Sequence, residues 1–118
     1  MIKEIKGIKK EVVLMSLPPI DSERYFNKIT HNLNSNNILN WLNGKKQVIS
    51  NWHERYNLEI FKLAINNDVP VIDITSKFLE HNNYAQFLCE DGVHPNEKGH
   101  QIIAEAIEDH IKRKNIIL

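Results

Sequence analysis

The fold of this chain is limited most by two short apolar runs. They lie on either side of a long segment whose apolar residues have helical spacing. Residues 11–17 read Glu-Val-Val-Leu-Met-Ser-Leu ahead of two prolines, and residues 69–74 read Val-Pro-Val-Ile-Asp-Ile. Apolar runs of this length are typical of strands buried in a parallel sheet. Between them, the apolar residues of 48–64 recur at steps of three and four, which predicts a helix of about four to five turns.

The remaining segments complete an alternating order of helices and strands. Residues 2–10 have the spacing of the end of a helix, with Ile5 and Ile8 on one face. Residues 21–46 are rich in Asn, Ser and Lys, and they predict a long connection with one or two short helical turns. Residues 97–112 supply the final helix. This order predicts an α/β domain with right-handed crossovers and a parallel sheet.

A short helix is expected at Thr75–Glu80, directly after the second apolar run. Thr75 or Ser76 is its expected N-cap, because a hydroxyl side chain accepts hydrogen bonds from the first free amides of a helix. Asp73, at the end of the preceding strand, is expected to cap or brace the loop that follows it.

The composition bounds the size of the fold and its partners. At 118 residues the chain makes at most one domain, and its 15 basic and 15 acidic side chains cancel. It has no electrostatic signature for nucleic acid or an anionic membrane, and no apolar run approaches the length of a membrane span. With one cysteine, Cys89, and no signal-peptide core after Met1, the sequence favours a cytoplasmic, reducing setting.

The stretch with the most specific chemistry is Asp91-Gly92-Val93-His94-Pro95-Asn96, which is followed by Gly99 and an apolar helix pattern. It places a carboxylate and an imidazole three residues apart in a tight turn just ahead of a helix. Such a pair is the acid–base half of a hydrolytic triad, with Asp91 orienting and charge-balancing His94 as general base. The alternative for two such residues is a local hydrogen bond without chemistry.

This stretch resembles the last sequence block of the SGNH (GDSL-type) esterases and acylhydrolases, which reads Asp-x-x-His-Pro, then a Gly and a helix. Three weaker matches precede it in the family's order: Leu17-Pro18-Pro19 after the fourth strand, Tyr56-Asn57 in the next helix, and Asp73-Ile74 after the fifth strand. The resemblance implies the C-terminal portion of a flavodoxin-like three-layer α/β fold. Its two parallel strands would be residues 11–17 and 69–74, with flanking helices.

The nucleophile of that family has no counterpart in this sequence. Its Gly-Asp-Ser segment is absent, and so is the Gly-x-Asn-Asp block that helps to form the oxyanion hole. We therefore expect residues 1–118 to form a single partial domain. Ser16, at the end of a strand, is expected to be structural, because a strand lacks the exposed turn that presents an attacking hydroxyl.

The resemblance implies acyl ester hydrolysis through a Ser-His-Asp triad, of which Asp91 and His94 are present. A small ester is the implied substrate, with no metal and no cofactor, and the chain alone is expected to be inactive. The alternative is a non-catalytic α/β module for self-association or partner binding.

Two structural expectations follow. Removing the first strands of such a fold exposes one backbone edge of residues 12–15, so we expect a homo-oligomer or a partner chain that supplies the N-terminal half. The Asp91 carboxylate should lie within hydrogen-bond reach of the near nitrogen of His94. Both side chains should lie at the carboxyl edge of the sheet, partly open to solvent.

Overall fold

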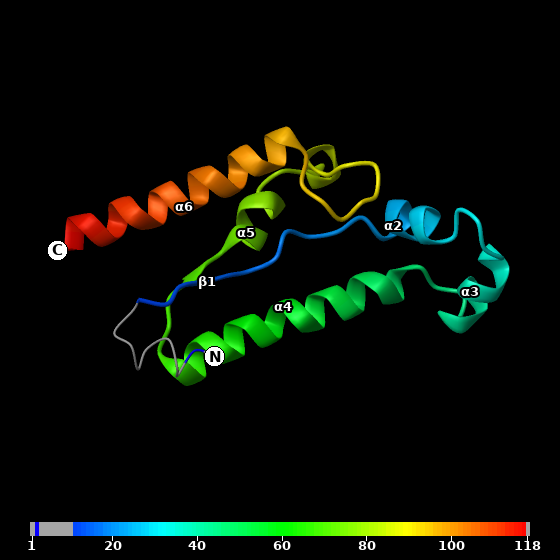
Figure 1. The fold of residues 1–118 in the computed structure, drawn as a ribbon, viewed down its shortest axis with the longest axis horizontal. Coiled ribbons are helices and arrows are strands. Elements are labelled where there is room, and N and C mark those ends of the chain that lie inside the picture. Colours follow the sequence, from blue (N-terminus) through cyan, green and yellow to red (C-terminus); the bar gives the residue numbers. More distant parts are fainter. Residues whose placement is uncertain (1, 3–10, 118) are drawn as a thin grey trace.

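The computed structural model describes Ile2 and residues 11–117, with the backbone alone for residues 115–117. The helix end expected at residues 2–10 therefore lies, apart from Ile2, outside the described residues. In chain order the elements are β1 (Leu14–Met15), α2 (Ser22–Ile29), α3 (Ser35–Trp41), α4 (Gln47–Asn67), β2 (Val71–Ile72), α5 (Ile74–Leu79), the 3-10 helix η1 (Tyr84–Phe87) and α6 (Glu97–Ile117) (Figure 1).

The strands β1 and β2 pair in parallel, as the sequence predicts, with Leu14 opposite Val71 and Met15 opposite Ile72. Helix α4 packs against β1 and α6 packs against β2. Figure 1 shows these two long helices on opposite sides of the strands, which gives three layers. The expected α/β architecture with a parallel sheet is confirmed.

Regular pairing is shorter than the runs 11–17 and 69–74 that the sequence predicts as strands. The backbone amide of Leu17 donates to Asn57 Oδ1 at 2.7 Å and so leaves the ladder. On the other strand, Pro70 has no amide hydrogen to donate. Asp73 already accepts a hydrogen bond from the amide of Ser76, 3.0 Å away, which begins α5.

The helices follow the predicted order with several changes at their ends. Helix α4 ends where Asp68 adopts a left-handed conformation with φ of 53°. The segment 21–46 forms two separate short helices, capped by the side chains of Asp21 and Asn34. The N-cap of α5 is Asp73, so the expectation of a cap at 75 or 76 is wrong. The Asp73 carboxylate, at the strand end, accepts from the amide of Ser76, so the helix begins two to three residues before the expected caps.

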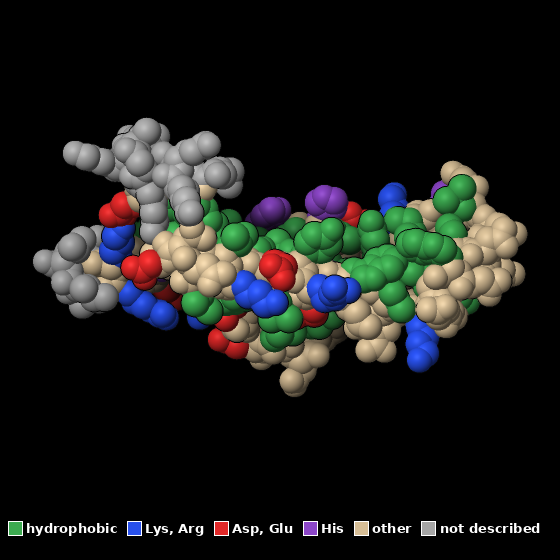
Figure 2. Space-filling view, turned by 90° about the horizontal axis from the view of Figure 1, so that it is seen from below, with side chains coloured by type: hydrophobic (Ala, Val, Ile, Leu, Met, Phe, Trp, Pro, Cys, Tyr) green, Lys and Arg blue, Asp and Glu red, His purple; other side chains and the backbone are tan. Residues whose placement is uncertain are grey.

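Most of the buried apolar side chains among the described residues form two clusters. One joins β2, α5 and α6 through Ile72, Ile74, Phe78, Leu88 and Ala106. The other joins α2, the loop after α3 and α4 through Ile20, Phe26, Leu42 and Ile49. Among the described helices, none is long and apolar enough to cross a membrane. Apolar side chains also gather in a band on the face shown in Figure 2, seen from the α4 side.

Candidate active site

Residues 88–96, here called the dyad loop, form a small closed hairpin between η1 and α6. Leu88 and Pro95 make an isolated antiparallel bridge, and the amide of Cys89 donates to the carbonyl of His94 at 2.7 Å. At the tip, the amide of Gly92 donates to the carbonyl of Cys89, and Gly92 takes a positive φ of 74°. A glycine adopts this conformation without the steric cost that a side chain would bring.

Asp91 and His94, here called the dyad, are joined inside this loop. Asp91 Oδ2 lies 2.5 Å from His94 Nδ1, so the expected contact is confirmed. Asp91 Oδ1 accepts from the backbone amides of Val93 and His94 at 2.9 and 3.0 Å. The two amides, followed by the His94 side chain, lower the pKa of Asp91 from 3.8 to about 2.

This contact fixes which imidazole nitrogen carries the proton. An ionised Asp91 carboxylate can only accept, so His94 Nδ1 must be the donor and the lone pair of neutral His94 lies on Nε2. The His94 side chain is 76% exposed, whereas Asp91 is 23% exposed. Within the described residues, no hydrogen bond occupies Nε2, which is therefore free to accept a proton.

The side of the loop that leads into α6 is fixed by Asn96 and Gly99. Asn96 Nδ2 donates to the carbonyls of Gln86 and Leu88 at 2.8 and 3.2 Å, and Asn96 Oδ1 accepts from the amide of Gly99 at 3.0 Å. A Cβ on Gly99 would lie 2.3 Å from the carbonyl oxygen of Phe87. The Asn and the Gly of the motif are thus structural, because they seat the dyad loop on the first turn of α6.

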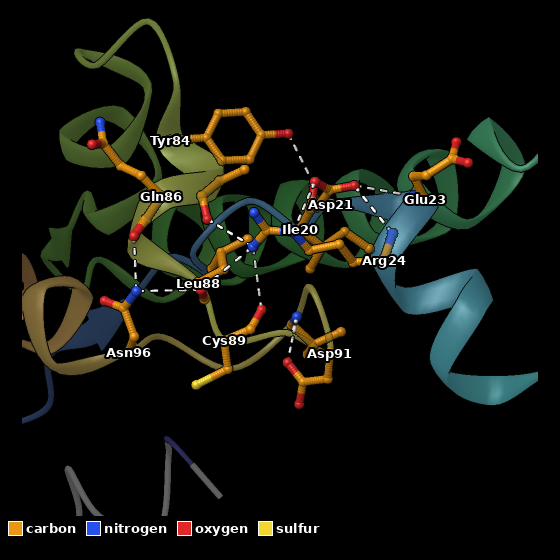
Figure 3. A network of polar contacts seen from close by, with 12 residues as sticks. Ile20, Asp21, Glu23, Arg24, Tyr84, Gln86, Leu88, Cys89, Asp91 and Asn96 are labelled. Carbon is orange, nitrogen blue, oxygen red and sulfur yellow. Dashed lines mark hydrogen bonds and ion pairs between the residues drawn. The ribbon is translucent and has the colours of Figure 1, made fainter. Parts of the chain in front are cut away.

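The opposite side of the dyad loop lies against α2, in the segment that the sequence predicted as a long connection with one or two short helical turns (Figure 3). The amide of Asp21 donates to the carbonyl of Gly92 at 2.8 Å, and the Tyr84 hydroxyl donates to the carbonyl of Ile20 at 2.9 Å. Asp21 and Ile20 follow the carboxyl end of β1. The dyad therefore lies at the edge of the sheet where the strands end, as expected.

Ser16 is not placed as a nucleophile. It is 3% exposed, its hydroxyl donates to Asp73 Oδ1 at 3.2 Å, and it accepts from the amide of Thr75 at 3.0 Å. Burial raises the pKa of Asp73, but hydrogen bonds from Ser76 and Ser16 outweigh it and hold this pKa below its usual value. The structural role expected for Ser16 and the capping role of Asp73 are confirmed.

Asn57, from the Tyr56-Asn57 pair, joins the same buried network. Its Oδ1 accepts from the amide of Leu17 and its Nδ2 donates to Thr75 Oγ1 at 2.8 Å. Thr75 Oγ1 in turn donates to the carbonyl of Leu17 at 2.5 Å. Asn57 thereby ties α4 to the ends of both strands, while Tyr56 is 72% exposed.

Metal-ligating side chains do not cluster in the part of the chain that the structure describes: no three His, Cys, Asp or Glu residues come together there. His81 lies against an aromatic neighbour, with its ring centroid 4.6 Å from that of Phe87.

Comparison with known proteins gives two positive findings. The family model described as GDSL-like lipase/acylhydrolase matches residues 1–107. The structure is similar to that of a GDSL-like lipase from Bacteroides thetaiotaomicron, with a TM-score of 0.61 and 20% sequence identity over 95% of this chain. This chain spans 47% of that protein, about half of its length. A search of curated proteins gave no significant match.

Proposed function

Because this chain belongs to the GDSL-like lipase/acylhydrolase family, we propose that it is the acid–base half of a serine ester hydrolase. Asp91 and His94 would be two members of a Ser-His-Asp triad. The observation that carries the proposal is the 2.5 Å contact between Asp91 and His94 Nδ1, together with an Nε2 that is open to solvent. An Nε2 already occupied by a donor of this chain would not be available to the attacking hydroxyl of a serine.

The chemistry assigned to the dyad has two proton transfers in each half of the reaction. His94 Nε2 takes the proton of the serine hydroxyl as the serine oxygen attacks the ester carbonyl, and Asp91 stabilises the imidazolium that forms. The imidazolium then gives its proton to the leaving alcohol, which leaves an acyl-enzyme. Water then attacks the acyl carbonyl and gives its proton to His94 Nε2. The imidazolium returns a proton to the serine oxygen as the bond between that oxygen and the acyl group breaks, which releases the acid and regenerates the serine.

The serine in this proposal comes from another polypeptide segment, since residues 1–118 contain no Gly-Asp-Ser. We place that segment on the free edge of β1. Among the described residues β1 pairs only with β2, while Val13 and Met15 are 36% and 45% exposed. The amides of Leu14 and Ser16 point to β2, so those of Val13 and Met15 point to the open edge. The similar GDSL-like lipase structure is about twice as long as this chain, so about half of it lies outside the match, which is enough for such a segment.

A complementation assay tests this function. The partner is an N-terminal segment of a family member carrying the Gly-Asp-Ser, Gly and Asn blocks, here called the nucleophile segment. We expect the 118-residue chain alone to show no His94-dependent hydrolysis of p-nitrophenyl acetate, and its complex with the nucleophile segment to hydrolyse this ester. His94→Ala should abolish the activity, and His100→Ala, at another exposed histidine, should not.

Three results would contradict the proposal. The first is ester hydrolysis by the chain alone that is lost in His94→Ala. The second is a complex whose rate of hydrolysis is the same with and without His94→Ala. The third is that the two segments do not associate. The first would show that the chain holds its own nucleophile. The second would remove His94 from the chemistry, and the third would remove the free edge of β1 as the docking site.

A further inference from the structure

The hydrogen bonds of the dyad lie inside its own loop. The direction in which His94 Nε2 points therefore depends on the contacts that hold that loop in place. Besides the seat on α6, the loop is held by the packing of Val93 against the core cluster around Phe26 and by polar contacts with the first turn of α2 (Figure 3). Arg24 Nη1 lies 2.9 Å from the carbonyl oxygen of Ala85 and 3.4 and 3.5 Å from those of Cys89 and Leu88. These carbonyls belong to η1 and to the start of the dyad loop. All three contacts are made by the one nitrogen Nη1, and the planar guanidinium leaves Nε on its other side to face Asp21.

Arg24 is itself held in place by Asp21, the N-cap residue of α2. Asp21 Oδ1 accepts from the amides of Glu23 and Arg24 at 3.1 and 3.3 Å, and Asp21 Oδ2 lies 3.7 Å from Arg24 Nε. The amide of Asp21 donates to the carbonyl of Gly92. One turn of α2 thus holds the dyad loop at Cys89 and again at Gly92, on both sides of Asp91.

The approach of α2 to the tip of the loop leaves no room for a side chain. A Cβ on Gly92 would lie 2.5 Å from the carbonyl oxygen of Asp21 and 2.8 Å from Arg24 Cβ. The contact is therefore backbone against backbone, and a small shift of the loop breaks the hydrogen bond between Asp21 and Gly92.

We propose that Arg24 is a positioning residue of the dyad, which fixes the loop on α2 so that His94 Nε2 is presented in one direction. The catalytic meaning of this role rests on the proposed function, but the contacts themselves do not. Without Arg24, the Asp91–His94 hydrogen bond survives, because all its partners lie within the loop, while the loop loses its side-chain contacts with α2 and is held less firmly in place. Lysine cannot replace Arg24, since one ammonium nitrogen cannot reach Asp21 and the Ala85 carbonyl together.

Nuclear magnetic resonance of the 118-residue chain tests this role without any need for activity. We expect Arg24→Lys and Arg24→Met to speed solvent exchange of the Asp21 amide at least about tenfold. The nuclear Overhauser effect between Gly92 Hα and the Tyr25 amide should be lost. The His94 Nδ1–H resonance should persist. Lys28→Met, at an exposed cation one turn further along α2, should change none of these signals.

The Thr30 amide, which donates to the carbonyl of Phe26 within α2, serves as the internal reference. If Asp21 and Thr30 accelerate equally, Arg24 stabilises the whole fold and the positioning role is wrong. It is equally wrong if Asp21 exchange stays within about twofold of the unsubstituted chain. In the complemented enzyme, Arg24→Lys should lower kcat about tenfold or more with KM little changed. An inactive unsubstituted complex would overturn the proposed function and leave the exchange result intact.

Discussion

At the scale of single residues, the ionised state of Asp91 is secured mainly by its own backbone. The amides of Val93 and His94 are the largest causes of its low pKa, and the His94 side chain comes after them. Asp91 should therefore titrate near its present value of about 2 even in His94→Ala, whose backbone amide remains. Titration of the Asp91 carboxyl carbon by nuclear magnetic resonance measures this, and a return to 3.8 in that variant would show that the imidazole is the main cause.

The same pKa fixes the pH range in which the turn is stable. A carboxylate whose pKa is lower in the folded state stabilises the fold above its unfolded pKa, and this stabilisation is lost as the pH falls. For Asp91 the loss runs from 3.8 down through about 2. We expect the amide resonances of Val93 and His94 to move across that range, with no comparable movement in an Asp91→Ala chain.

Asn57 offers a second prediction at this scale. It is 3% exposed and satisfies the amide of Leu17 and the hydroxyl of Thr75. Asn57→Ala leaves both groups buried with one partner fewer, so we expect the free energy of unfolding to fall by about 2 kcal/mol. Asn51→Ala, at an exposed position of the same helix, should change it by less than about 0.5 kcal/mol. Urea denaturation measures both, and equal effects would contradict the role of the network.

The distance in sequence between partners decides which residues of the site could be predicted. Asp91 and His94 are three residues apart and every donor to Asp91 lies within the same turn, so spacing alone was sufficient. Arg24 meets its carbonyl partners 61 to 65 residues away. No local pattern encodes that meeting. Only the cap signal of Asp21 ahead of Ser22 and Glu23 could have indicated that a helix begins there.

At the scale of elements, the contribution of the contact between the dyad loop and α2 to stability can be measured separately from the cost of a left-handed backbone. Gly92 and Gly44 have nearly the same positive φ, 74° and 73°. A Cβ on Gly44 would meet nothing within 4 Å, whereas one on Gly92 would strike the backbone of Asp21. Both substitutions to Ala carry the cost of a left-handed residue, so their difference reports the contact with α2.

We expect Gly92→Ala to lower the free energy of unfolding by at least about 1 kcal/mol more than Gly44→Ala does. Thermal or urea denaturation of the two variants gives this difference directly. Equal destabilisation would mean that the loop moves away from α2 without cost, which would contradict the tight junction.

The strand β1 leads to a prediction about assembly. Its open edge carries an exposed Val13 and Met15, and the segment has no lysine or proline to discourage pairing. In the absence of the nucleophile segment we expect the chain to self-associate through residues 12–15. Met15→Lys should shift it toward monomer, while Ile111→Lys, at an exposed apolar residue of α6, should not. Light scattering at micromolar concentration is the measurement, and a monodisperse unsubstituted monomer would contradict the prediction.

Helices and strands could be predicted from the sequence where the spacing of apolar residues is regular, and less well where it is not. The apolar repeat of α4 predicted a long helix because that pattern persists over many turns. The Asn-rich segment of α2 and α3 has low helical propensity, and those helices depend on their caps and on packing around Phe26 and Leu42. Strand lengths were predicted too long because Asn57 and Asp73 end the pairing through long-range and capping contacts.

At the scale of the whole molecule, the chain is elongated for its size. Its radius of gyration is 17.1 Å and its extents are 55 × 29 × 21 Å. A compact domain of this length would have a radius of gyration of about 13–14 Å. The two core clusters are separate, and Trp41, Tyr56 and Ile65 are more than 70% exposed. A molecule with this shape and exposure has apolar surface that a further segment can cover.

The final prediction follows from that surface. A segment that binds the folded chain and not the unfolded one adds stability in proportion to its occupancy, about 2.7 kcal/mol at a hundred times its Kd. We expect the nucleophile segment to raise the Tm of the 118-residue chain by roughly 10 °C at that excess. Met15→Lys should reduce the shift, because the substitution places a charge on the strand edge where pairing is proposed, and Ile111→Lys should preserve it. Scanning fluorimetry over a concentration series gives the result. A Tm that does not depend on the concentration of the added segment would show that the open edge of β1 is not where the rest of a hydrolase assembles.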